Sequence, residues 1–372
     1  MSPENKKTIH VLIVDDSYFM RKILQDLLSE TIGMITVVDT AQNGIEALEK
    51  TKKMKPDVIT MDVEMPQMDG LAALEKIMEE CPTPVLMLSS HTGQGTEATI
   101  RALELGAVDC IAKPAGRVLE NVRVIQEELI EKIKLASLCR PKFRPENTIK
   151  SNSNGSLSKE LRKSTVSKIT KKTEKNLKAI YVVAVASSTG GPRALNDLFS
   201  RINWSPLTAF VIVQHISIGF TQALARRLNE VSQLNVMEAE KGSCLMGGCA
   251  YVAPGGIHSI LEGKPGSYRI DFSDLPPRLG VKPSADIMMS SAAKIAGSKC
   301  MGVVLTGMGR DGTLGLQDIK GMGGKTFAQN PESCVVYGMP KSAFDAGVVD
   351  RQLPLDKMAH ELNEIMIRTK ES

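Results

Sequence analysis

Residues 8–135 alternate short apolar runs with amphipathic stretches, and this alternation restricts the fold more than any other feature of the chain. Five runs have the length and β-branched content of buried strands, and apolar residues at helical spacing follow each one. Five strand–helix units in a row predict a doubly wound parallel sheet with functional loops at the carboxyl ends of its strands. The expected strands are Ile9–Val14, Ile35–Asp39, Val58–Asp62, Pro84–Ser89 and Asp109–Ala112. The expected helices are Tyr18–Leu28, Gly44–Lys53, Leu71–Glu79, Glu97–Leu105 and Val118–Leu138.

A second strand–helix pattern starts near residue 179 and continues to about residue 369. It predicts a second, larger α/β domain whose sheet is parallel or mixed. The expected strands are Ala179–Ala186, Ala209–Gln214, Asn235–Glu238, Ala250–Ala253, Ser267–Asp271, Met301–Thr306 and Lys325–Ala328. The expected helices are Pro192–Arg201, Thr221–Glu230, Ala285–Ala296, Thr313–Gly321 and Asp356–Arg368.

Between the two patterns the composition changes. Residues 140–178 hold twelve Lys and Arg against three Glu, many Ser, Asn and Thr, and few large apolar residues. Such a segment buries too little apolar surface to fold, so we expect a flexible basic linker. A nucleic-acid-binding tail is the alternative, but no aromatic residue after Phe143 alternates with these charges. The expected divisions are a first domain at 1–139, the linker at 140–178 and a second domain at 179–372.

Composition argues against several classes of protein. The net charge of +4 is mild and does not by itself indicate a nucleic-acid partner. The seven cysteines are scattered and odd in number, which favours free thiols, and Cys244 and Cys249 lack the neighbours of a zinc site. The first residues form no apolar leader, and no apolar run reaches the roughly 20 residues of a membrane span. We expect a cytoplasmic, soluble monomer that is not inserted in a membrane.

Charged and polar side chains gather at the strand ends of the first domain. They are Asp15, Asp16, Asp62, Ser89 and Lys113, each at or just after the end of an expected strand. Because parallel strands end at one edge of a sheet, we expect these groups to converge. Clustered carboxylates repel one another unless a hard cation such as Mg²⁺ joins them. A carboxylate beside Mg²⁺ and a lysine is well placed to accept a phosphoryl group.

Four short motifs surround these strand ends. They are Val14-Asp15-Asp16, Met61-Asp62-Val63-Glu64-Met65-Pro66 with Asp69-Gly70, Ser89-Ser90, and Lys113-Pro114. The first domain thus resembles the receiver domain of two-component response regulators, which has a flavodoxin-like fold. The resemblance implies that Asp62 is the phospho-acceptor. It also implies that Asp15, Asp16 and the backbone of Glu64 help hold Mg²⁺, that Ser89 is the switch hydroxyl, and that Lys113 contacts the phosphoryl group. One departure is Cys110, where many receivers carry an aromatic switch residue.

The second domain opens with a serine-containing corner. The apolar run Ile180–Ala186 leads into Ser187-Ser188-Thr189-Gly190-Gly191, and Pro192 fits the first turn of a helix. A serine on a strand-to-helix corner stands clear of the sheet near free backbone N–H groups, as a nucleophile requires. On this segment alone, a phosphate-binding turn is an equally good interpretation.

Two further strand ends favour the nucleophile. His215 follows the apolar run that ends at Gln214, and Asp311 lies just beyond the expected strand Met301–Thr306. If these strands are neighbours, Ser188 attacks, His215 takes its proton, and Asp311 orients the imidazole. The segment at 307–312 also fits the G-x-G-x-x-G pattern of dinucleotide-binding proteins. That interpretation is weak, because the acidic residue it needs, Glu332, stands in an expected turn rather than at a strand end.

Motifs throughout this half resemble the catalytic domain of the chemotaxis protein-glutamate methylesterases. They are Ser188–Pro192, Gln214-His215 with Gly219-Phe220-Thr221, Tyr251–Gly255 with His258, Leu305–Gly309 with Asp311-Gly312, and Ala328-Gln329-Asn330 through Cys334–Pro340. The resemblance implies Ser188 as nucleophile, His215 as base, Asp311 as orienting acid, and backbone N–H groups near Thr189 and Met308 as oxyanion donors. It implies hydrolysis of glutamate methyl esters and deamidation of glutamines on chemoreceptors, with a chemotaxis histidine kinase as phosphodonor and no cofactor in this domain.

The sequence departs from that family in places, and two other functional classes are alternatives. Ser187 places a second hydroxyl beside Ser188, and Val281 replaces a histidine common in the family, which bears on substrate preference more than on chemistry. A receiver fused to a binding module without catalysis is one alternative. A DNA-binding response regulator is another, but its output domain needs only about 65–100 residues with a basic recognition helix, and this one is about twice as long and rich in strands.

Overall fold

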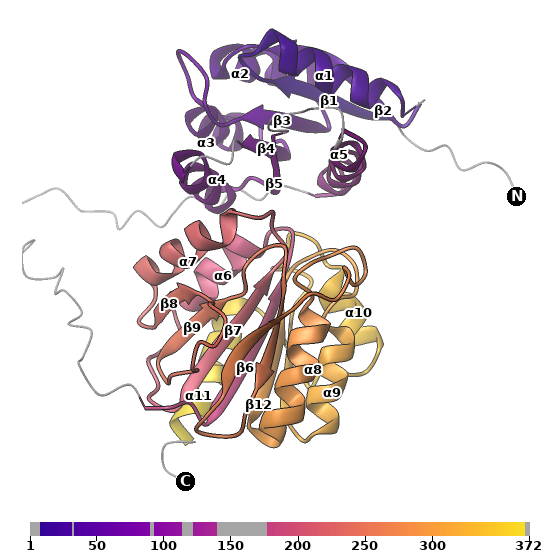
Figure 1. Cartoon of the computed structure of the whole chain (residues 1–372). Coiled ribbons are helices and arrows are strands. Elements are labelled where there is room, and N and C mark those ends of the chain that lie inside the picture. Colours follow the sequence, from indigo (N-terminus) through magenta and orange to yellow (C-terminus); the bar gives the residue numbers. More distant parts are fainter. Residues whose placement is uncertain (1–7, 32, 90–92, 114–121, 140–176, 369–372) are drawn as a thin grey trace, which may run out of the picture.

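The computed structural model describes residues 8–31, 33–89, 93–113, 122–139 and 177–368, which form two α/β units stacked on each other (Figure 1). Nearly all of the expected linker, together with Ser90 and Pro114, lies outside the described residues. The expected domain boundaries therefore remain predictions. Among the helices of the described segments, none has the length and hydropathy needed to cross a membrane.

The first unit is a five-stranded parallel sheet with the strand order β2-β1-β3-β4-β5, which confirms the predicted fold class. Its strands are β1 Ile9–Val14, β2 Ile35–Ala41, β3 Val58–Asp62, β4 Val85–Ser89 and β5 Asp109–Ala112. Its helices are α1 Tyr18–Ser29, α2 Gly44–Met54, α3 Gly70–Glu80, α4 Gly93–Leu105 and α5 Val122–Ala136.

Side-chain caps fix where three of these helices begin. Ser17, Asn43 and Asp69 have extended backbones, and the oxygen of each side chain accepts a hydrogen bond from a backbone N–H of the first helical turn. Each cap satisfies a donor that the helix itself cannot satisfy. Because Ser17 and Asp69 lie shortly after β1 and β3, the caps also set the turns that lead away from the carboxyl edge of the sheet.

The second unit is a seven-stranded sheet with the order β14-β13-β12-β6-β7-β9-β8, and every strand pair in it is parallel. Its strands are β6 Tyr181–Ser187, β7 Thr208–Gln214, β8 Asn235–Glu238, β9 Cys249–Val252, β12 Cys300–Val304, β13 Lys325–Gln329 and β14 Arg351–Leu353. Its helices are α6 Gly191–Phe199, α7 Phe220–Val231, α8 Ala285–Ala296, α9 Thr313–Gly321, α10 Met339–Asp345 and α11 Leu355–Arg368. A short 3₁₀ turn, Gly297–Lys299, follows α8.

The structure contains elements that the pattern did not predict. β10 His258–Glu262 and β11 Arg269–Ser273 form an antiparallel hairpin beside the main sheet, of which only β11 was expected. β10 mixes polar and apolar residues in five positions, which hides its period. α10 has seven residues and β14 has three, so neither is long enough to display a clear repeat. The ends of the expected elements differ from the observed ones by a few residues.

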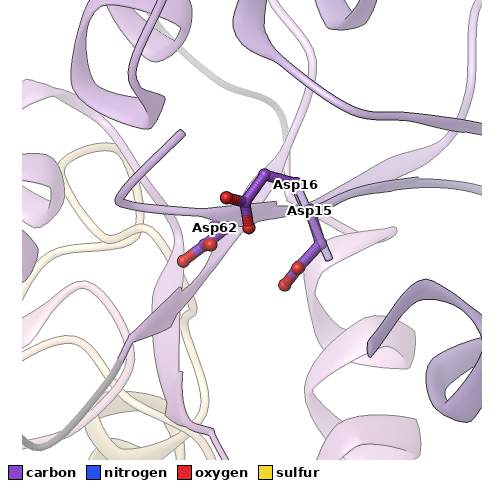
Figure 2. A group of neighbouring side chains, drawn as sticks. All are labelled: Asp15, Asp16 and Asp62. Carbon is purple, nitrogen blue, oxygen red and sulfur yellow. The ribbon is translucent and has the colours of Figure 1, made fainter. Parts of the chain in front are cut away.

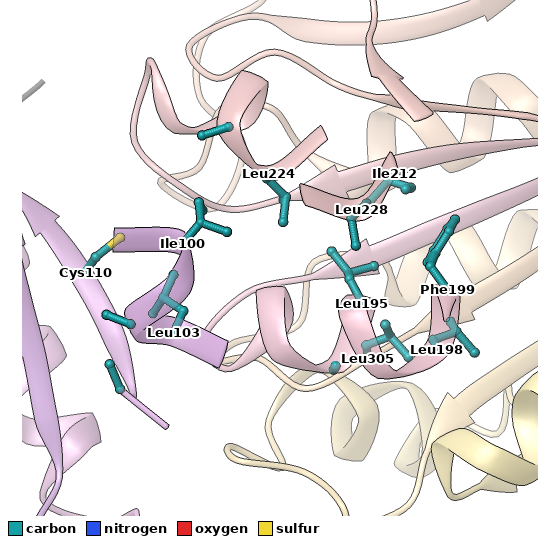
Figure 3. Packing of buried hydrophobic residues seen from close by; sticks show 14 of the residues in the cluster. Ile100, Leu103, Cys110, Leu195, Leu198, Phe199, Ile212, Leu224, Leu228 and Leu305 are labelled. Carbon is teal, nitrogen blue, oxygen red and sulfur yellow. The ribbon is translucent and has the colours of Figure 1, made fainter. Parts of the chain in front are cut away.

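The first unit packs on the second unit through α4, which lies against α6 and α7 (Figure 1). Buried side chains from both units form one apolar cluster, with Ile100 and Leu103 of α4 facing Leu195 and Leu224 (Figure 3). Polar contacts surround this cluster: Arg227 Nε lies 2.6 Å from Glu104 Oε1, and an Arg226 N–H lies 3.2 Å from Glu97. The contact places the first unit at the edge of the second sheet where the serine corner lies.

Candidate active site

The acidic pocket of the first unit forms as the sequence predicted. Oxygens of Asp15, Asp16 and Asp62 lie within 4.8 Å of one another at the ends of β1 and β3 (Figure 2). Lys113, directly after β5, places its Nζ 2.7 Å from an Oδ2 atom of both Asp15 and Asp62. Oδ2 of Asp15 is buried, and its contact with Lys113 is an ion pair. Three carboxylates and one ammonium leave an excess of negative charge, and this donor set fits a hard divalent cation.

Burial and charge shape the titration of this pocket. Burial raises the pKa of the Asp62 carboxyl, and the charge of Asp15 adds to that effect. The Lys113 ammonium and the backbone N–H of Glu64 oppose the rise without cancelling it. Burial works against the charged form of Lys113, but its two carboxylate neighbours raise the pKa of Lys113 above the usual value. Lys113 therefore remains a cation beside Asp62 at neutral pH.

Ser89 links this pocket to the helix at the domain contact. Its side chain is fully buried at the end of β4, and its hydroxyl lies 3.1 Å from the backbone carbonyl of Gly95 in α4. Cys110, in β5, is also buried and belongs to the apolar cluster that joins the two units. Ser89, which the resemblance implied as the switch hydroxyl, thus contacts α4 directly.

The serine corner joins β6 to α6. Ser187, the last residue of β6, is buried and donates its hydroxyl hydrogen to Oε1 of Gln214 over 2.7 Å. Ser188 comes next and is partly exposed. Gly190 has a φ of 74°, and a Cβ atom on Gly191 would lie 1.9 Å from Gln214 Oε1. The corner therefore requires both glycines, and it holds Ser187 inward while Ser188 reaches the surface.

His215 and Asp311 meet beside this corner. β6 is the central strand of the adjacent set β12-β6-β7, so residues that follow these three strands share one edge. The Nε2 atom of His215 lies 2.8 Å from Oδ2 of Asp311, and the backbone N–H of His215 donates to Ser187. Since an ionised carboxylate only accepts hydrogen bonds, Nε2 carries the proton of the neutral ring, and Nδ1 is then the basic nitrogen.

Asp311 is held by the start of α8 as well as by His215. Its carboxylate accepts hydrogen bonds from the Ser284 hydroxyl at 2.8 Å and from the backbone N–H groups of Ala285 and Asp286 at 2.6 and 3.0 Å. Burial alone would raise the pKa of Asp311, but His215 and these N–H groups lower it below its usual value. Asp311 is therefore ionised at neutral pH.

The loop after β12 closes the other side of the corner. The backbone N–H of Ser188 donates to Thr306, and a Cβ atom on Gly307 would lie 2.6 Å from Ser188 Cβ. Only glycine fits there, so the backbone at Met308 follows close beside the serine. In the part of the chain that the structure describes, the backbone N–H groups of Thr189 and Met308 donate no hydrogen bond.

Two features of the site were missed by the sequence analysis. The Thr189 hydroxyl donates a 2.6 Å hydrogen bond to Asp109, which belongs to β5 of the first unit. Asp286 accepts hydrogen bonds from Gly312 and Gly315 at the start of α9. The first contact joins distant segments and left no signal in the sequence. For the second, Ser284 followed by acidic Asp286 before an apolar repeat is a recognisable helix start.

The dinucleotide interpretation of residues 307–312 receives no support from this geometry. The N–H groups of Gly312 and Gly315, which would face a phosphate at the start of α9, are already occupied by the Asp286 carboxylate. A second carboxylate, Asp311, precedes them in the same loop. Glu332 lies in a turn after β13 rather than at a strand end.

Fold and site together define a class: a parallel α/β domain with an acidic pocket, joined to a second α/β domain that brings a serine, a histidine and an aspartate to one sheet edge. Comparison with known proteins identifies the family within this class. The receiver domain family of response regulators matches residues 11–122, and the family described as CheB methylesterase matches residues 183–362. The chain belongs to the family of two-domain CheB protein-glutamate methylesterases.

Curated relatives match over nearly the whole chain. A protein-glutamate methylesterase/protein-glutamine glutaminase of Pyrococcus abyssi is 42% identical over 358 residues, covering 96% of this chain and 93% of its own. The protein of the same name from Geobacillus kaustophilus is 41% identical over 372 residues, covering 97% of this chain and 99% of its own.

Solved structures match each unit separately. The crystal structure of the Thermotoga maritima CheB methylesterase catalytic domain is 40% identical, covers 50% of this chain and 98% of its own, and has a TM-score of 0.48. The response regulator domain of Thermotoga maritima CheB is 47% identical, covers 36% of this chain and all of its own, and has a TM-score of 0.34.

Proposed function

We propose that this protein removes methyl groups from glutamate methyl esters, and deamidates glutamines, on methyl-accepting chemoreceptors in the cytoplasm. Ser188 is the nucleophile, His215 the base and Asp311 the acid that orients it. The observation that carries the proposal is the hydrogen bond between His215 and a buried, ionised Asp311, directly beside a serine at the end of the central strand. The named activities of the full-length relatives agree with this chemistry.

The mechanism follows from the positions of these groups. As Ser188 Oγ forms a bond to the ester carbonyl carbon, Nδ1 of His215 takes the hydroxyl proton, and the carbonyl oxygen becomes negative. The unoccupied N–H groups of Thr189 and Met308 are available to stabilise that oxygen. His215 then returns the proton to the departing methoxide, which leaves as methanol, or to the departing amine, which leaves as ammonia. Water, deprotonated by His215, hydrolyses the acyl-enzyme and frees Ser188.

Regulation acts through the receiver. We propose that a chemotaxis histidine kinase supplies the phosphoryl group to Asp62, with Lys113 contacting it. Asp15, Asp16, Asp62 and the backbone of Glu64 would hold Mg²⁺, which fits three carboxylates whose negative charge exceeds that of the single Lys113 ammonium. When bound, this ion neutralises charge on the phosphoryl oxygens. The second domain has no cofactor in this scheme, and the protein acts as a monomer without a nucleic-acid partner.

In its unphosphorylated form the receiver would obstruct access to Ser188. Asp109 bonds Thr189, the residue after the nucleophile. α5 of the receiver also lies beside Met308, one of the proposed oxyanion donors, and Ile130 and Leu135 of α5 line a surface depression together with Met308. Phosphorylation would therefore activate the enzyme by shifting the population away from the packed arrangement.

The two neighbouring serines provide the direct test. Ser188→Ala should lower methanol release from methylated chemoreceptor membranes by at least about a thousandfold, because it removes the attacking oxygen. Ser187→Ala is the matched control: its hydroxyl is bound to Gln214 inside the corner, so most of the activity should remain. If Ser187→Ala abolished turnover and Ser188→Ala did not, the role of nucleophile would pass to Ser187.

A further inference from the structure

Asp286 is a second buried carboxylate next to the proposed catalytic acid. Its exposed fraction is 2%, against 3% for Asp311. Among the described residues it makes no hydrogen bond to His215 or Ser188, so it has no part in the proton transfers described above. A carboxylate this deeply buried is costly to maintain without partners.

The partners of Asp286 lie at the start of α9. Its Oδ1 atom accepts hydrogen bonds from the backbone N–H groups of Gly312, at 2.8 Å, and Gly315, at 3.0 Å. Gly312 is the N-cap position of α9 and has no side chain to cap the helix itself. Asp286 therefore takes over the capping of α9 from the neighbouring helix.

Asp311 does the same for the other helix. It lies two residues before α9, and its carboxylate accepts from Ala285 and Asp286 in the first turn of α8. Each helix is thus capped by a carboxylate that belongs to the start of the other. A Cβ atom on Gly315 would lie 2.4 Å from Met289 Cβ, so the two helices also pack closely against each other at this point.

Reciprocal capping holds the main chain at Asp311 in place. Gly312 follows Asp311 directly, so any movement of the Gly312 N–H away from Asp286 moves the Asp311 main chain and its hydrogen bond to His215. Burial and the nearby Asp311 raise the pKa of Asp286, while the Gly315 and Gly312 N–H groups and Arg278 work in the other direction. Arg278, whose Nε lies 3.3 Å from Oδ2, provides a countercharge.

We propose that Asp286 is a positioning residue for the reaction, which holds Asp311 in line with His215 by capping α9. This inference rests on the proposed role of Asp311. A displacement of about 1 Å in a catalytic group can cost about a hundredfold in rate. We therefore expect Asp286→Ala to lower kcat by about tenfold to a hundredfold and to change KM little.

The conservative variant separates this role from a general loss of structure. Asp286→Asn keeps an oxygen that can accept from Gly312 and Gly315, so it should recover most of the activity that Asp286→Ala loses. Asp318→Ala is the matched control. Asp318 also joins the two helices, through a 2.5 Å hydrogen bond from Ser290, but it does so on the exposed side. Its removal should leave kcat unchanged.

A double-mutant cycle in the full-length protein decides the matter. If Asp286 acts through Asp311, then Asp286→Ala should add nothing to the loss caused by Asp311→Ala, as measured by methanol release from methylated chemoreceptor membranes. Multiplicative losses, or full activity of Asp286→Ala, would overturn this inference alone. Unchanged activity of Asp311→Ala would overturn the proposed catalytic site as well. Should Asp286→Ala fail to fold, Asp286→Ser takes its place in the same cycle.

Discussion

At the scale of single residues, Asp311 ties stability to pH. Its pKa is lowered on folding, so it favours the folded state above the pKa of the unfolded chain and loses that effect as pH falls through its folded pKa. Asp311→Asn should therefore reduce the free energy of unfolding of the second domain by about 1–3 kcal/mol near neutral pH. The difference from the wild type should shrink below about pH 4.

Urea unfolding from pH 7 to pH 3 measures this dependence. Trp204, the single tryptophan of the chain, lies in the second domain and reports on that domain by fluorescence. Asp274→Asn is the control, since Asp274 is exposed and takes part in no described ion pair. A difference between wild type and Asp311→Asn that grew on acidification would mean that Asp311 is not stabilised in its charged form.

The sequence predicts those site residues that lie at strand ends, because a continuous apolar run marks where each strand ends. Ser188, His215 and Asp62 each end or follow a continuous apolar run, and parallel strands bring such positions to one edge. Asp286 and Thr189 are different. The role of Asp286 depends on how closely α8 and α9 approach, and the bond from Thr189 depends on how two domains dock. Neither the helix approach nor the domain docking produces a periodic pattern in the sequence.

At the scale of elements, α4 and α7 connect the two units through charge. Glu104 is largely buried, with 14% of its side chain exposed, and it pairs with Arg227. The hydrogen bond that Arg227 donates to Glu104 is the largest influence and raises the pKa of Arg227, while burial works in the other direction. The Ser89 hydroxyl contacts the same α4 at Gly95, so this helix joins the phosphorylation pocket to the domain contact.

Reversing one charge in that pair should activate the enzyme. Glu104→Arg places two cations together, and a contact weakened by about 1 kcal/mol shifts the population about fivefold toward the open arrangement. Methanol release without phosphodonor should rise by about that factor. The double variant Glu104→Arg with Arg227→Glu restores an ion pair and should return to the basal rate. Equal activity of the single and double variants would show that this pair does not hold the domains together.

At the scale of the whole molecule, the contact between the two units both holds them together and reaches the residue beside the proposed nucleophile. The apolar cluster around Ile100, Leu103, Leu195 and Leu224 is continuous across the units, so the receiver is held by the same kind of packing that stabilises each domain (Figure 3). Asp109 and Thr189 bring the edge of that surface to the residue beside the nucleophile. We therefore expect a change at α4 to alter access to Ser188 without any change in the catalytic groups.

We expect phosphorylation of Asp62 to act only through the contact that α4 makes with the second unit. Asp62→Ala should abolish the rise in methanol release that a small phosphodonor such as acetyl phosphate causes, because the acceptor carboxylate is gone. Glu79→Gln is the control: Glu79 is an exposed residue on α3, and this variant should respond like the wild type.

The combined variant Asp62→Ala with Glu104→Arg tests whether phosphorylation acts only at this contact. If phosphorylation merely opens the domain contact, this variant should be about fivefold active without phosphodonor and indifferent to it. Basal activity in the combined variant would instead mean that Asp62 acts on the catalytic domain by a route other than α4.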